Sequence, residues 1–103
     1  MLSYKFTSQA LADLIEIREY SQSHWGSKQS DTYSQQIETA LHLLSEFPDL
    51  GRVYSELDNS FRGYSVSSQI IFYRVNKNIL VVHGILHQRM LPHRILTDSK
   101  ENK

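Results

Sequence analysis

The sequence of 103 residues contains no cysteine. That absence excludes a disulfide framework, thiol catalysis, and zinc or iron–sulfur sites held by cysteine. No apolar run approaches the roughly 18 residues that a membrane-spanning helix needs, and the first residues lack the apolar stretch of a signal peptide. We therefore expect a cytoplasmic protein that makes no contact with a membrane.

The fingerprints of common enzyme classes are also missing. The chain has no glycine-rich phosphate loop, no Gly-x-Ser-x-Gly elbow, no His-Glu-x-x-His pair and no EF-hand pattern. No carboxylate lies near the C-terminal histidines in sequence to complete a metal site with them. We expect neither a cofactor nor a bound metal.

What is present is the composition of one folded domain, with 40% hydrophobic and 21% charged residues. We expect a single domain over residues 1–96 and a polar tail over residues 97–103. The net charge of zero hides an asymmetry, because residues 1–51 carry a net charge of −4 and residues 52–103 a net charge of +4. Both sets of charges could be solvated faces, or the basic half could serve an anionic or acidic partner.

The first half of the chain predicts a strand followed by a helix. Apolar and polar residues alternate over residues 2–7, as in a short half-buried strand. Thr7 or Ser8 can cap the helix that follows, with Asp13 near the positive end of its dipole, and Gly26 suits its end. The apolar positions of this helix recur at helical spacing: Leu11, Leu14 and Ile15.

A second helix is predicted by a longer apolar stripe that Pro48 ends. Its members are Tyr33, Ile37, Ala40, Leu41, Leu44 and Phe47. Residues 25–27 are a short link, so the two helices should form an antiparallel hairpin. Residues 49–51 predict a turn, and the polar residues 55–60 predict a loop.

Three strands are predicted after that loop, over residues 61–67, 70–75 and 79–86, and residues 76–78 form a tight link typical of a β-hairpin. The predicted fold is α+β: an N-terminal strand, an α-helical hairpin and a three-stranded antiparallel meander, with the helices on one sheet face. Strict alternation in the last strand assigns one set of residues to the helix side: Leu80, Val82, Gly84 and Leu86. The opposite set is Ile79, Val81, His83, Ile85 and His87.

Candidate functional residues gather at the end of the last strand and on its neighbours. They are Arg62, Arg74, His83, His87, Arg89, His93 and Arg94. A nuclease could use His83 or His87 as acid or base, with Arg62, Arg74 or Arg89 around the phosphate. Alternatively, His83 is satisfied by a neighbouring side chain, and Arg62 or Arg74 has a structural role, with its head group paired to Glu56 or Asp58.

Several short segments, in this order, resemble ParE toxins. They are residues 25–26, 47–52, 61–62, 71–75 and 85–90, and the similarity runs from about Tyr4 to Leu96. The resemblance implies the RelE/ParE superfamily, the toxins of type II toxin–antitoxin modules. ParE-like members inhibit DNA gyrase by trapping the cleaved DNA complex and are not enzymes, whereas RelE-like members cut messenger RNA on the ribosome. A third reading is an inactive homologue that only binds its antitoxin.

The resemblance also implies two protein partners, a ParD-like antitoxin and DNA gyrase. The acidic C-terminal segment of the antitoxin should fold into the groove between the helical hairpin and the sheet. The candidate antitoxin-binding residues are Leu11, Trp25, Arg52, Arg62 and Arg74. The candidate gyrase-binding residues are His87, Arg89, His93 and Arg94. The chain departs from the family pattern after Met90, since Leu91 stands where Asp is usual.

Overall fold

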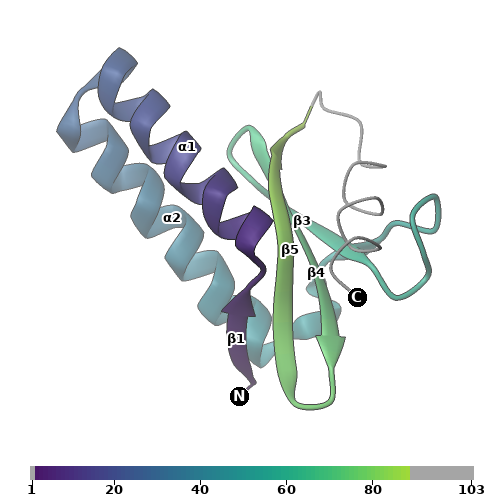
Figure 1. Cartoon of the computed structure of the whole chain (residues 1–103). Helices are drawn as coiled ribbons and strands as arrows, with labels where there is room; N and C mark the ends of the chain where they lie inside the picture. Colours follow the sequence, from purple (N-terminus) through teal and green to yellow (C-terminus); the bar gives the residue numbers. More distant parts are fainter. Residues whose placement is uncertain (1, 89–103) are drawn as a thin grey trace.

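The computed structural model describes residues 2–88, except for the side chains of residues 21–22, 24–25, 27–31 and 33. The elements follow in the order β1 (Ser3–Phe6), α1 (Ser8–Trp25), α2 (Ser27–Glu46), η1 (Pro48–Leu50), β2 (Arg52–Val53), β3 (Arg62–Val66), β4 (Gln69–Asn76) and β5 (Ile79–His87). This order confirms the predicted α+β fold (Figure 1). In the described part of the chain, no helix is long and apolar enough to cross a membrane.

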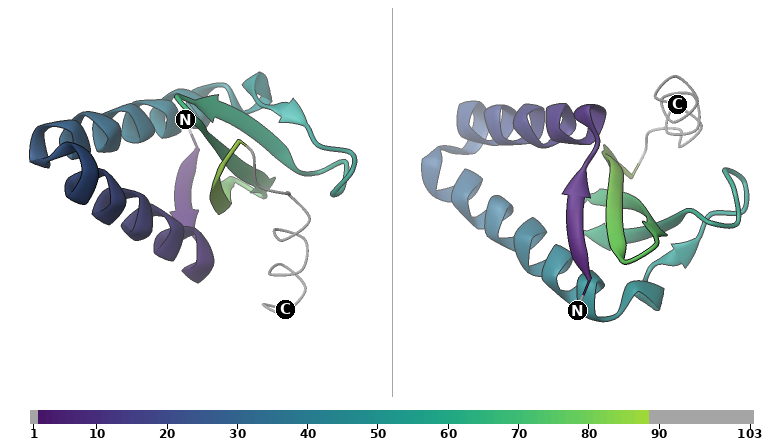
Figure 2. Two further views of the ribbon diagram at one scale, coloured as in Figure 1. Left: turned by 90° about the horizontal axis from the view of Figure 1, so that it is seen from above. Right: turned by 60° about the horizontal axis from the view of Figure 1, so that its bottom comes forward.

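The strands form one five-stranded sheet in the order β1-β5-β4-β3-β2. β1 runs parallel to β5, and the other neighbouring strands are antiparallel. The sequence did not predict β2, which is only two residues long and exposed on both of them. The helical hairpin lies on one side of the sheet (Figure 2). We call the opposite side the far face.

The helical hairpin begins and turns where the sequence predicted. The Thr7 hydroxyl accepts a hydrogen bond from the Ala10 N–H at 3.1 Å, so Thr7 caps α1. Gly26 alone joins the two helices with a φ of 91°, a left-handed conformation that favours glycine. α2 ends at Glu46, one residue before the predicted Phe47, whose side chain is exposed.

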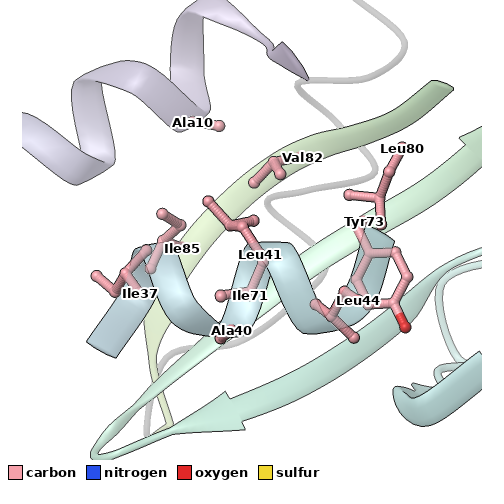
Figure 3. Packing of buried hydrophobic residues seen from close by; sticks show 10 residues of the cluster. All are labelled: Ala10, Ile37, Ala40, Leu41, Leu44, Ile71, Tyr73, Leu80, Val82 and Ile85. Atoms are coloured by element: carbon pink, nitrogen blue, oxygen red, sulfur yellow. The ribbon is translucent and has the colours of Figure 1, made fainter. Parts of the chain in front are cut away.

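The main core lies between the hairpin and the sheet (Figure 3). Its buried members are Ala10, Ile37, Ala40, Leu41, Leu44, Ile71, Tyr73, Leu80, Val82 and Ile85. The predicted stripe of α2 is therefore confirmed at its four central positions. The predicted stripe of α1 is wrong in part, because Leu11 and Ile15 are 50% and 49% exposed. α1 is rotated so that Ala10 and Asp13 point inward, and Leu14 is only half-buried.

A β-bulge in β5 overturns the predicted faces of its second half. Phe72 pairs with Gly84 and Tyr73 pairs with Val82, which leaves His83 as an extra residue in β5. The alternation therefore shifts by one position after His83. Ile85 joins the main core instead of the far face, and Leu86 joins a second cluster instead of the helix side.

The second cluster covers part of the far face. Its buried members are Leu57, Phe61, Phe72 and Leu86, with Tyr54 and Ile70 packed against them. The chain between β2 and β3 supplies Leu57, so the polar loop predicted over residues 55–60 contributes one core side chain. The sheet is thus apolar on both faces, and the helices cover only one of them.

α1 also protects the edge of β5 beyond the end of β1. The Thr7 N–H donates to the Val82 carbonyl at 3.0 Å, continuing the ladder by one residue. One turn and a half later, the buried Asp13 carboxylate accepts a hydrogen bond from the Ile85 N–H at 3.1 Å. Asp13 therefore acts as a partner for the strand. The predicted interaction with the helix dipole is wrong, because Asp13 lies beyond the first turn of α1, which contains no acidic residue.

Candidate functional site

Arg74 and His83 form the centre of the polar part of the far face. The Arg74 Nε–H donates to His83 Nε2 at 3.3 Å. The Arg74 guanidinium lies over the Phe61 ring, 4.5 Å from its centroid, and the His83 ring meets the same ring edge-on at 5.2 Å. Arg74 and His83 are therefore held together by a hydrogen bond and by a shared aromatic support.

His83 is neutral at neutral pH. Burial and, to a smaller extent, the nearby Arg74 charge together lower its pKa from 6.5 to about 4. Since Nε2 accepts from Arg74, the proton of the neutral ring lies on Nδ1. This arrangement agrees with the interpretation that a neighbouring side chain forms the hydrogen bond that the His83 ring needs.

The two histidines considered as alternatives for the acid or base lie on different faces. His83 lies on the far face with Phe61, whereas alternation from Ile85 puts His87 on the helix side. The bulge is the cause, because without the extra residue both histidines would point the same way. Of the two alternatives, His83 is the one that lies beside Arg74.

Arg62 fastens the turn after α2. Its guanidinium donates to the carbonyl oxygens of Asp49 and Gly51 at 3.2 and 2.7 Å, and it pairs with the Asp49 carboxylate at 3.5 Å. The structural role considered for Arg62 is thus present, but the predicted partners Glu56 and Asp58 are wrong for it. Arg62 pairs in register with Tyr73 of the main core, so it lies on the helix side, opposite to Arg74.

Arg52 lies on the far face at the other edge of the sheet. Its guanidinium stacks over the Tyr54 ring at 3.9 Å and lies 4.0 Å from the Glu56 carboxylate. Both side chains of this ion pair are exposed, so the pair contributes little stability. The three arginines proposed to bind antitoxin carboxylates are therefore divided between the two faces.

The remaining predicted site residues lie elsewhere or outside the described residues. Leu11 is exposed on α1 and forms an apolar surface with Ile15 one turn away. Trp25 ends α1, but its side chain lies outside the described part. The other residues outside it are Arg89, Leu91, His93 and Arg94. Among residues 2–88, no group of three or more acidic or histidine side chains is placed to hold a metal ion.

Two concave surfaces accompany these residues. The first, which we call the far-face cavity, has a volume of about 810 Å³. It is lined by Lys5, Ser8, Ser60, Arg74, Val81 and His83, among others. The second, which we call the hairpin groove, has a volume of about 430 Å³ between α2 and β3. Its apolar lining comes from Ala40, Leu43, Tyr64 and Val66.

Sequence reasoning missed the hairpin groove residues and Lys5. The sequence did contain clues to both. Leu43 is an apolar residue outside the α2 stripe, and Lys5 occupies an outward-facing position of an alternating strand. Lys5 and Arg74 lie on either side of Val81 because β1 pairs in parallel with β5, and local sequence patterns do not specify that pairing.

Comparisons with known proteins agree with this fold. Residues 4–92 match the family model described as ParE toxin of type II toxin–antitoxin system, parDE. The chain is 30% identical over 90 residues to Toxin ParE1 of Caulobacter vibrioides, covering 87% of this chain and 93% of that protein. It is 32% identical over 88 residues to Toxin ParE1 of Mycobacterium tuberculosis, covering 84% and 90%.

A solved structure shows the same fold. It is titled Chromosomal ParDE TA system from P. aeruginosa, and it superposes with a TM-score of 0.72 at 20% identity. The match covers 84% of this chain and 96% of that one. The family model spans most of the chain, and the two relatives align over nearly their whole length. The chain therefore belongs to the ParE family of toxins of type II toxin–antitoxin systems.

Proposed function

We propose that this protein inhibits DNA gyrase by trapping the cleaved DNA complex, that it acts in the cytoplasm and that it is not an enzyme. Its family membership is the observation that carries the proposal. The end of β5 with the segment that follows is the proposed gyrase contact. Its residues are His87, Arg89, His93 and Arg94. Growth inhibition and plasmid maintenance would follow from this activity.

Purified protein should inhibit supercoiling by gyrase and accumulate linear plasmid after detergent treatment. The Arg89, His93 and Arg94 triple alanine variant should lose both effects. Lys77→Gln is the matched control, because Lys77 lies in the turn before β5, at the opposite end of that strand from His87. Normal supercoiling and no cleaved plasmid at micromolar wild-type protein would contradict the proposal.

We propose that a ParD-like antitoxin neutralises the protein by binding in the hairpin groove. The groove is apolar along Leu43, Tyr64 and Val66, which suits the apolar face of an amphipathic segment. Because β2 pairs only with Arg62 and Gly63, the outer edge of β3 beyond Gly63 has no strand partner in the described part. A bound antitoxin segment would cover both the groove and this edge.

The ribonuclease alternative gains no support from the site. The histidine must lie near the arginines that hold the phosphate, and a catalytic acid needs a proton at neutral pH. His83 and His87 lie on opposite faces, and the pKa of His83 is lowered to about 4. Mapping transcript ends after expression would test this alternative, since cuts at codon positions within minutes would favour it. Expression without any growth defect would favour an inactive homologue instead.

A further inference from the structure

Lys5 and Arg74 lie in one row across the centre of the sheet. Lys5 of β1 pairs in register with Val81 of β5, and Arg74 of β4 pairs with the same residue from the other side. Residues in register on neighbouring strands point to the same face. Leu80 and Val82 belong to the main core, so Val81 and both cations point to the far face.

The spacing of this row leaves room between the two cations. Neighbouring strands lie about 4.8 Å apart, so the backbones of Lys5 and Arg74 are separated by about 10 Å. Val81 lies between them, and the far-face cavity opens above it. The two side chains therefore approach this cavity from opposite walls. Ser60 and Ser8 add hydroxyl groups to its lining.

Among the described residues that line this cavity, Lys5 and Arg74 carry a charge, and both charges are positive. Within residues 2–88, Lys5 forms no ion pair. The Asp58 carboxylate interacts electrostatically with Arg74, and hydrogen bonds from the Ser60 backbone and hydroxyl also lower the pKa of Asp58. The positive charge of Arg74 also acts on His83, because it contributes to the lowered pKa of that side chain. An anion between the cations would relieve this repulsion.

We propose that the far-face cavity binds a phosphate ester, held between Lys5 and Arg74. A forked guanidinium and an ammonium on opposite walls can together bind the three free oxygens of a phosphate ester, which also carries more negative charge than a carboxylate does. The volume of about 810 Å³ is that of a small-molecule site and has room for the nucleoside attached to the phosphate. The phosphate could come from a free nucleotide or from a nucleic-acid strand. This inference depends on neither the gyrase contact nor the antitoxin.

The test is an NMR titration of the full chain alone, at low salt, with inorganic phosphate, AMP, a short single-stranded oligonucleotide and acetate in parallel. Phosphate and AMP should shift the signals of the Lys5 ammonium and the Arg74 Nε–H with saturation in the millimolar range. The bound anion should also raise the pKa of His83. Lys5→Gln and Arg74→Gln should each weaken binding at least about tenfold, while Lys77→Gln should not.

The outcomes are separable. Tighter binding of the oligonucleotide, with a strong salt dependence, would identify a strand as the source of the phosphate. Equal binding of AMP and oligonucleotide would identify a single nucleotide. The proposal is overturned if no cavity signal saturates, if Lys77→Gln weakens binding as much as Lys5→Gln, or if acetate binds as well as phosphate. Because Lys5 is exposed, Lys5→Gln should fold normally, and its thermal unfolding checks this.

Discussion

At the scale of single residues, Asp13 accepts a hydrogen bond from a backbone N–H of β5 that no neighbouring strand in the described part of the chain accepts. Asp13 is only 5% exposed, which is unusual for a charged residue on a helix that packs against apolar side chains. Its two oxygens accept hydrogen bonds from the Gln9 amide and the Ile85 N–H, both at 3.1 Å. A buried carboxylate is tolerated because these bonds satisfy it, and in return a buried strand N–H is satisfied.

Replacing Asp13 with Ala should lower the free energy of unfolding by about 1–3 kcal/mol, because the Ile85 N–H would be left buried without an acceptor. Asp13→Asn should lose less, since its amide oxygen can still accept that hydrogen bond. Urea denaturation measures both changes. Glu16→Ala is the control on the exposed side of α1. Equal stability of Asp13→Ala and wild type would show that the Ile85 contact contributes nothing.

His83 should make the protein less stable in mild acid. The pKa of His83 is about 4 in the folded protein and 6.5 in an unfolded chain. Between these values the unfolded chain binds more protons, so stability should fall as pH decreases from 6.5 towards 4 and should not change through His83 above that range. Urea midpoints measured over this range should fall less in His83→Gln. An imidazole titration near 6.5 in the folded protein would refute the lowered pKa of His83.

At the scale of elements, the features that were predicted correctly are those set by local sequence patterns. The strand and helix order, the Thr7 cap and the Gly26 link all follow from residues close together in the chain. The bulge at His83 could not be predicted, because it depends on how β5 pairs with β4. The face of α1 was assigned wrongly for a similar reason. Tertiary contacts select the small Ala10 and the polar Asp13 for the interior over the larger Leu11 and Ile15.

Tyr73 links the sheet to η1. Its hydroxyl donates to the Pro48 carbonyl at 2.6 Å and accepts from the Gly51 N–H at 2.9 Å, and burial raises its pKa. Tyr73→Phe keeps the packing of the ring but leaves both backbone groups without this partner. We expect it to lower the free energy of unfolding by about 1–3 kcal/mol, measured by urea denaturation. Amide exchange at Gly51 should accelerate as well, and an unchanged rate would show that the hydroxyl does not hold the turn.

At the scale of the whole molecule, the basic half of the sequence is not one basic surface. Arg62 is tied to the turn on the helix side, while Arg52 and Arg74 lie on the far face. Charge counted along the chain could not show this division, since it depends on strand register. An acidic antitoxin that uses all three arginines must therefore contact both faces of the sheet, which requires a segment long enough to pass around its edge.

This division gives the arginines different expected effects on antitoxin binding. The Arg52→Gln and Arg74→Gln double variant should keep its stability close to that of wild type and lose about tenfold in affinity, with a weaker salt dependence. Arg62→Gln should instead lower the urea midpoint, because it releases the turn. Calorimetry with the antitoxin peptide and denaturation of the free protein measure the two quantities separately, with Lys77→Gln as the charge control. If replacing Arg62 and Arg74 together leaves the affinity unchanged, electrostatic recognition by these residues is ruled out, and the apolar hairpin groove must account for the binding.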